Sequence, residues 1–184
     1  MRRPNRVAGM RIQGLGRFLM QTSLVAALSG GFAAAALAQP ETPVIVRVRS
    51  SDAALATLLE RAAHGSGTMR DLVAAIERSN GIVIIEAGTC GHGVRACLKI
   101  WMKTAGDCRY LRVVIDRRSG DSEIEVMSSI GHELQHAIEA LSEPGVTDSF
   151  DLYNFFGRIA PTNRSRFETT AALHAGDAVR DELR

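Results

Sequence analysis

The sequence predicts a single domain of the α+β class that follows a cleavable N-terminal segment. Apolar residues at helical spacing alternate with short β-branched runs, which is the mixture expected when helices pack on a sheet. The chain has 184 residues, and removal of the first 38 leaves 146 (39–184), enough for one domain with a sizeable core. The remainder contains no internal repeat. We expect a small, mainly antiparallel sheet packed on two C-terminal helices.

The first 38 residues predict a secretory signal peptide. Five arginines and no acidic residue lie in this segment, an apolar stretch covers 18–35, and Ala36-Leu37-Ala38 forms a cleavage site. A start at Met10 would give a shorter signal. The alternative is an uncleaved membrane anchor, although Ser29-Gly30-Gly31 interrupts the apolar stretch. We therefore expect a periplasmic or secreted protein with no membrane segment in its mature form.

The charge of the predicted mature chain argues against nucleic-acid binding. The whole chain has 22 Lys and Arg, so loss of five arginines leaves 17 against 20 Asp and Glu, a net charge of −3. An extended basic surface, which supplies most of the affinity for nucleic acids, is not expected on such a chain.

The N-terminal half predicts a strand followed by two helices. Residues 44–48 are mostly β-branched and predict a strand, whereas leucines recur at helical spacing over 52–63. A second helix is expected over 69–78, because Asn80-Gly81 ends its pattern.

Three strands are expected next, over 82–87, 97–102 and 110–115, with a turn at 105–107 between the last two. If 82–87 and 96–102 formed a hairpin, Cys90 and Cys97 would lie near each other at its tip. Export permits a disulfide, and this pairing would leave Cys108 free or buried. A zinc site that uses His92 with these cysteines is the alternative, but Cys-x-x-Cys spacing is absent.

A long amphipathic helix is predicted from Asp121 or Ser122 to the break at Pro144-Gly145. Either residue can cap the helix, and Glu123 and Glu125 suit its positive N-terminus. Apolar residues recur along one face at positions 124, 127, 130, 134, 138 and 141. This stripe would pack into the core.

His132-Glu133-Leu134-Gln135-His136 lies within this helix and off the apolar stripe. Residues i and i+4 share one helix face, so two imidazoles can reach one metal ion. Glu133 could accept a proton from a water molecule activated by that metal. The simpler interpretation is that all three are ordinary polar residues of an amphipathic helix.

Catalytic zinc has three protein ligands and one open position, so a third ligand is needed. Glu168 is the best remaining candidate. It lies near the start of a segment, 167–176, that predicts a helix. Small residues after Glu168 would let this helix approach the first one closely.

This pattern resembles the gluzincin clan of zincin metallopeptidases. The likeness consists of His-Glu-x-x-His and, on a later helix, Glu-x-x-Ala beginning at Glu168. The chain is also similar to small exported bacterial proteins that carry Gly-His-Glu-Leu-Gln-His-Ala, here 131–137, and Phe-Glu-Thr, here 167–169. The resemblance covers about residues 111–183, less than half of the chain.

The resemblance implies a minimal zincin-like domain that holds Zn²⁺. In that clan the two histidines and the downstream glutamate bind zinc, and the motif glutamate is the general base. Carried over to this chain, His132, His136 and Glu168 are the ligands and Glu133 is the base.

Two other zincin patterns fit less well. The metzincin continuation requires Gly and His where this chain has Glu139 and Ser142. Residues 145–148 faintly resemble an aspzincin element, which leaves Asp148 or Asp151 as a rival third ligand. Asp148 is equally well explained as a helix cap.

Gluzincins stabilise the tetrahedral oxyanion with a Tyr or His outside the motif. Tyr153 is the catalytic candidate for this role, with His174 and Tyr110 as alternatives. By analogy with zincins, an edge strand beside the motif helix, here 98–102, would hold an extended peptide by backbone pairing.

The sequence thus predicts an exported zinc metallopeptidase acting on a peptide or protein substrate. Two alternatives stay open: a zincin-fold binding or regulatory protein without turnover, and a protein whose zinc is purely structural.

Overall fold

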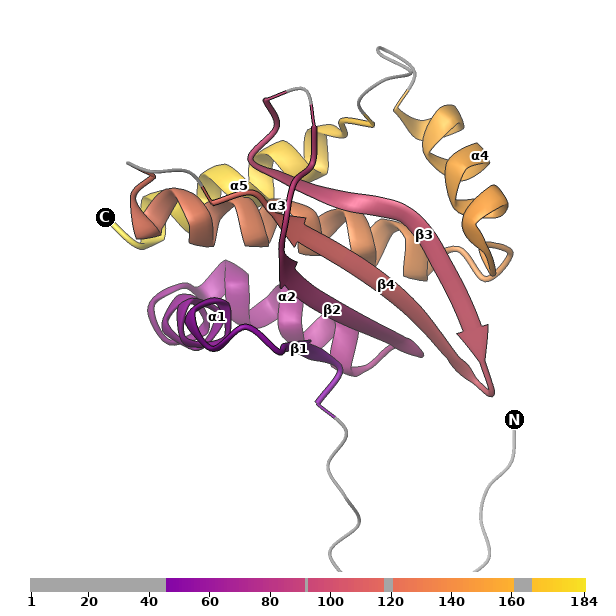
Figure 1. Cartoon of the computed structure of the whole chain (residues 1–184), viewed down its shortest axis with the longest axis horizontal. Helices are drawn as coiled ribbons and strands as arrows, with labels where there is room; N and C mark the ends of the chain where they lie inside the picture. The colour runs from indigo at the N-terminus through magenta and orange to yellow at the C-terminus, as the bar shows by residue number, and fades with distance from the viewer. Residues whose placement is uncertain (1–45, 92, 118–120, 161–166) are drawn as a thin grey trace, which may run out of the picture. The chain divides into compact units, whose positions relative to one another are not determined.

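The computed structural model describes residues 46–184 except 92, 118–120 and 161–166 (Figure 1). The predicted signal peptide, His92 and the start of the first predicted strand lie outside these residues. The limits of the predicted domain, 39–184, therefore stay a prediction.

The described strands form one four-stranded sheet in the order β1-β2-β4-β3 (Figure 1). They span Val48–Ser50 (β1), Gly81–Ala87 (β2), Ala96–Ala105 (β3) and Cys108–Ile115 (β4). β1 pairs with β2 and β2 with β4 in parallel, whereas β3 pairs with β4 antiparallel. The sheet is therefore mixed and mostly parallel, so the prediction of a mainly antiparallel sheet was wrong.

The expected hairpin between β2 and β3 was also wrong, because β4 lies between these strands. The burial of the side chains explains the order. β4 buries Val113 and Val114, which point to opposite faces, and such a strand suits the sheet interior. β3 carries the half-exposed Lys99 and the exposed Lys103, and charged side chains are typical of an edge.

Five helices are present in the described part of the chain. They span Ala53–Gly65 (α1), Gly67–Glu77 (α2), Glu123–Ser142 (α3), Ser149–Ile159 (α4) and Thr170–Glu182 (α5). The predicted helices over 52–63, 69–78 and the motif segment are confirmed as α1, α2 and α3.

The last helix begins later than predicted, so Glu168 lies just before α5 and not on a helix. The reason is that Thr169 is the N-cap residue of α5: its side chain accepts a hydrogen bond from the backbone N–H of Ala172, so the helix begins after it. The expectation of a glutamate on the C-terminal helix is corrected accordingly.

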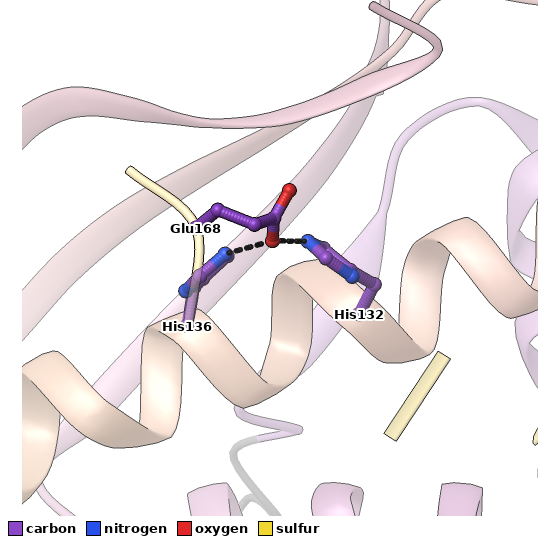
Figure 2. A group of neighbouring side chains, drawn as sticks. All are labelled: His132, His136 and Glu168. Carbon is purple, nitrogen blue, oxygen red and sulfur yellow. Dashed lines mark ion pairs between the residues drawn. The ribbon is translucent and has the colours of Figure 1, made fainter. Parts of the chain in front are cut away.

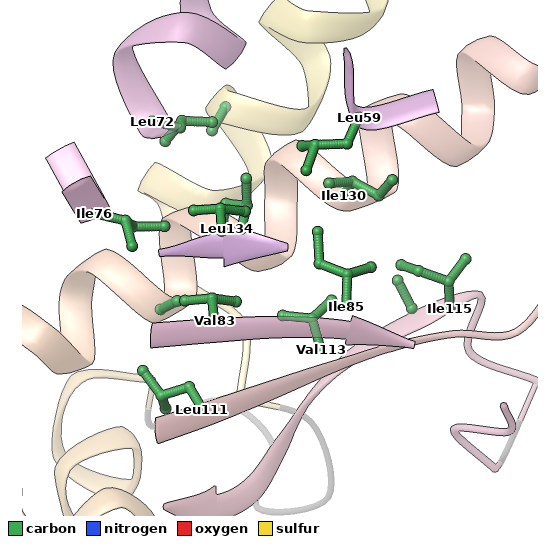
Figure 3. Close-up of a cluster of buried hydrophobic side chains, with 14 of the residues drawn as sticks. Leu59, Leu72, Ile76, Val83, Ile85, Leu111, Val113, Ile115, Ile130 and Leu134 are labelled. Atoms are coloured by element: carbon green, nitrogen blue, oxygen red, sulfur yellow. The ribbon is translucent and has the colours of Figure 1, made fainter. Parts of the chain in front are cut away.

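The hydrophobic core lies between the sheet and helices α1 to α3 (Figure 3). Fully buried side chains meet there, including Val83, Ile85, Leu111, Val113, Ile115, Ile130 and Leu134. Burial of each such side chain stabilises the fold by about 1.5–3 kcal/mol, which anchors α3 on the sheet.

Helix α5 packs closely on α3, as the small residues of its segment predicted. A Cβ atom added at Gly176 would lie 3.2 Å from the His132 Cβ, and one at Gly131 would lie 2.8 Å from the Val179 side chain. The two glycines therefore permit an approach that larger residues would resist.

The C-terminal end of α3 is held by the buried side chain of Arg109, near the start of β4. Its guanidinium donates hydrogen bonds to the carbonyl oxygens of Leu141, Glu143 and Val146, at 2.5, 2.9 and 3.0 Å. It also donates to the Asn80 side chain at 2.9 Å. The bonds to Leu141 and Glu143 supply partners for carbonyls that the helix end leaves unsatisfied, and the bond to Val146 ties down the loop that follows.

Cys90 and Cys97 form a disulfide with their Cα atoms 5.8 Å apart, so the predicted pairing is confirmed. The bond joins the loop after β2 to β3, and Cys108 is free and half-buried. Disulfides persist in oxidising compartments, which this bond therefore indicates. None of the helices described is both long and apolar enough to cross a membrane.

Candidate metal centre

Helix α3 presents both motif histidines. The Ser122 side chain caps its N-terminus, and the acidic Glu123 and Glu125 lie in the first turn, where the helix dipole favours them. Its buried stripe fixes its rotation on the sheet. His132 and His136 therefore lie one turn apart on a face that meets the segment before α5.

The carboxylate of Glu168 lies beside both imidazoles (Figure 2). Its Oε1 atom is 3.0 Å from Nε2 of His132 and 3.7 Å from Nε2 of His136. One ligand atom from each of these three residues lies within 4.8 Å of the others. The predicted triad is thus brought together as a candidate metal site.

The rival ligands are engaged elsewhere. Asp148 caps α4 by accepting hydrogen bonds from the backbone N–H groups of Phe150 and Asp151. Asp151 accepts from the backbone and the hydroxyl of Thr147. Neither aspartate belongs to the group of neighbouring ligand side chains in the described residues.

The opposite charges of Glu168 and His136 stabilise each other. Burial alone would raise the pKa of Glu168, but hydrogen bonds and positive charge from the two histidines outweigh it and lower the pKa to about 2. Burial alone would lower the pKa of His136, but hydrogen bonds to Glu139 and Glu168 raise it to about 9. Glu168 is therefore ionised at neutral pH, ready to bind a cation.

Glu133 is almost fully buried beside the triad, with only 5% of its surface exposed. Its Oε2 atom accepts a hydrogen bond from the backbone N–H of Leu98 on the edge strand β3, at 2.6 Å. Burial raises the pKa of this carboxyl, although the charges of both histidines and the Leu98 bond oppose the rise. A carboxylate with a raised pKa is better suited to accept a proton near neutral pH.

The candidate oxyanion donors have no contact with the triad comparable to that of Glu133 in the described residues. Tyr153 on α4 is 47% exposed, and its ring meets Phe167 edge-to-face at 5.5 Å, next to Glu168 in the chain. His174 on α5 is exposed, and Tyr110 on β4 is half-buried. Within the described residues, no hydrogen bond joins any of the three to the triad, so the catalytic role of Tyr153 stays a prediction.

Sequence reasoning missed Glu139, which contacts the triad directly. Its Oε2 atom lies 3.0 Å from Nδ1 of His136, and its Oε1 atom accepts a hydrogen bond from the Thr169 hydroxyl at 2.6 Å. The sequence feature that could have revealed this contact is the i,i+3 spacing of Glu139 from His136, which places both on one helix face. The sequence had drawn attention to this position only because it lacks the metzincin glycine.

No protein-family model, curated protein or solved structure matched the chain.

Proposed function

We propose that the mature chain is an exported zinc-dependent metallopeptidase that hydrolyses peptide bonds. The observation that carries this proposal is the convergence of His132, His136 and Glu168, with the buried carboxylate of Glu133 on the same helix. The predicted signal peptide and the disulfide support export. The substrate would be a peptide or protein.

The three side chains fit zinc by their chemistry. Two imidazole nitrogens and one carboxylate oxygen form a common donor set of catalytic zinc sites, and three protein ligands leave a position open. Two ligands at about 2.0–2.2 Å from one ion cannot lie more than about 4 Å apart. The two pairs that join Glu168 to a histidine, at 3.0 and 3.7 Å, satisfy this limit, and all three ligand atoms lie within 4.8 Å of one another. The Glu168 side chain is 43% exposed, so solvent can reach the site.

Zinc bound in such a site lowers the pKa of water and polarises a carbonyl group. Glu133 would take a proton from the attacking water and then deliver it to the departing amine. The Leu98 N–H bond would hold its carboxylate in place, and burial would keep its pKa raised.

The edge strand is the proposed support for the substrate backbone. β3 is the outermost strand on its side of the described sheet, and Leu98 lies against Glu133. An extended peptide could add to such an edge. Tyr153 or His174, both with exposed side chains, is the proposed donor that would stabilise the oxyanion.

A zinc-binding protein without turnover is the second candidate. One observation favours it: Glu133 has little exposed surface and already holds a hydrogen bond to Leu98. To act as a base, Glu133 must either break its hydrogen bond to Leu98 or accept the proton on its other carboxylate oxygen.

The substitution Glu133→Gln separates these functions, with Glu123→Gln on the exposed start of α3 as its matched control. Glutamine keeps the shape and can accept the Leu98 bond, but it cannot take up the proton. We expect zinc affinity close to that of the parent, while cleavage of casein or a mixed peptide library falls by about 10²-fold or more. Loss of zinc from the variant would make Glu133 a ligand. A parent that binds zinc and cleaves no peptide would favour the second candidate.

A further inference from the structure

Glu139 lies on α3 about one turn after His136. It contacts two parts of the site, the His136 ring and the segment that carries Glu168. Its side chain is 13% exposed, and its two oxygens have different partners. One faces Nδ1 of His136 at 3.0 Å, and the other accepts a hydrogen bond from Thr169 at 2.6 Å. Glu139 therefore bridges α3 and the segment that carries Glu168.

The contact with His136 selects the nitrogen that can bind a metal. A carboxylate can only accept, so Nδ1 must carry a proton when it faces Glu139. In the neutral imidazole, Nε2 is then left with a free lone pair. Nε2 is also the nitrogen that faces Glu168, at 3.7 Å. Glu139 thus holds the ring in the tautomer and orientation that the triad requires.

The contact with Thr169 fixes the third ligand. Thr169 follows Glu168 directly, and its hydroxyl oxygen also accepts the bond from Ala172 that caps α5. Glu168 precedes the helix, so its backbone is not held by helical hydrogen bonds. The bond from Thr169 to Glu139 is therefore a link between the ligand on the loop and the ligands on α3.

We propose that Glu139 is a positioning residue for two ligands at once: it sets the tautomer of His136 and, through Thr169, holds Glu168 against α3. This inference rests on the metal site of the proposed function. Partners of this kind typically change metal affinity by about 10–100-fold.

Three substitutions test the two contacts separately. In Glu139→Gln, the amide oxygen can still accept from Thr169, but the NH₂ group donates to Nδ1 and moves the imidazole proton to Nε2. Thr169→Val is nearly isosteric and removes the bond to Glu139 together with the cap that Thr169 gives to α5. Glu139→Ala removes both contacts. Glu123→Gln is the control, because it makes the same chemical change at an exposed position of the same helix.

Zinc affinity, measured by competition with a chelator, and the visible absorption of the Co²⁺-loaded protein are the measurements. We expect Glu139→Gln to lower zinc affinity about 10–100-fold and to alter the Co²⁺ spectrum. Thr169→Val should lower affinity more in the parent than in the Glu139→Ala background, because the loss of the α5 cap is common to both and only the parent also loses the bond to Glu139. Glu123→Gln should match the parent in both measurements.

The outcomes distinguish this inference from the proposed function. A parent that takes up no zinc overturns both. If the parent binds zinc and Glu139→Gln matches it in affinity and spectrum, the positioning role alone is refuted. If the Glu139 variants fail to fold, as judged by circular dichroism in EDTA, Thr169→Val decides, and unchanged affinity refutes the link to Glu168.

Discussion

Arg109→Met should destabilise the whole domain, because Arg109 supplies the hydrogen-bond partners at the end of α3. Arg109 is 6% exposed and donates to four backbone carbonyls, those of Ala140, Leu141, Glu143 and Val146. Methionine fills similar space but donates no hydrogen bond, so it removes the partners without opening a large cavity.

The magnitude follows from the carbonyls that lose their partners. Leu141 and Val146 are buried, and each unsatisfied buried group costs about 1–3 kcal/mol. Glu143 is exposed, and water can replace its bond. Burial lowers the pKa of Arg109, and removal of the desolvated charge offsets part of the loss. We expect a net loss of about 2–5 kcal/mol in the free energy of unfolding, by this counting of groups.

Urea unfolding followed by circular dichroism in EDTA measures this loss without a contribution from metal. Arg112→Met is the matched control on the same strand, because its side chain is 40% exposed, pairs with the half-buried Glu86 and lies over the ring of Trp101. The control should change stability by less than about 1 kcal/mol, as exposed ion pairs do. Equal stabilities of the two variants would refute the view that Arg109 secures the end of α3.

Two further predictions concern the metal and the disulfide. With the pKa of His136 at about 9 in the metal-free protein, that ring is charged at pH 7. Zinc binds the neutral imidazole, so binding near pH 7 should release about one proton from this residue, and affinity should rise as pH increases toward 9. Titration calorimetry in buffers of different ionisation enthalpy measures the release, and a binding enthalpy that is independent of the buffer would contradict it. Removal of the disulfide by Cys90→Ser with Cys97→Ser should cost about 2 kcal/mol of stability, since the closed loop is short. Cys108→Ser, which breaks no disulfide, should leave stability almost unchanged, and equal losses in the two proteins would contradict the assigned pairing.

Much of the secondary structure and two of the ligands could be predicted from the sequence. The helices α1 and α3 carry their caps, Asp52 and Ser122, and their apolar periodicity within their own residues. The convergence of His132 and His136 follows from the pitch of a helix alone. Glu168 required the resemblance as well, because a ligand from a distant segment has no local signature.

The disulfide was predicted correctly for a reason that proved wrong. A hairpin between β2 and β3 was expected to bring the cysteines together, but β4 lies between those strands. Cys90 and Cys97 are seven residues apart, so the closure of a short loop was sufficient without the hairpin.

The strand order and the partners of Arg109 and Glu139 were decided only by the tertiary structure. A local pattern records which residues prefer a helix or strand, because caps and periodicity involve neighbours within a few positions. It does not record which strand is buried on both faces, or that Glu139 meets Thr169 thirty residues later. Such choices depend on the combined burial and hydrogen bonding of segments that become neighbours only when the chain folds. For this protein, the sequence by itself determined the chemistry of the motif helix, and long-range packing determined the environment that holds its ligands together.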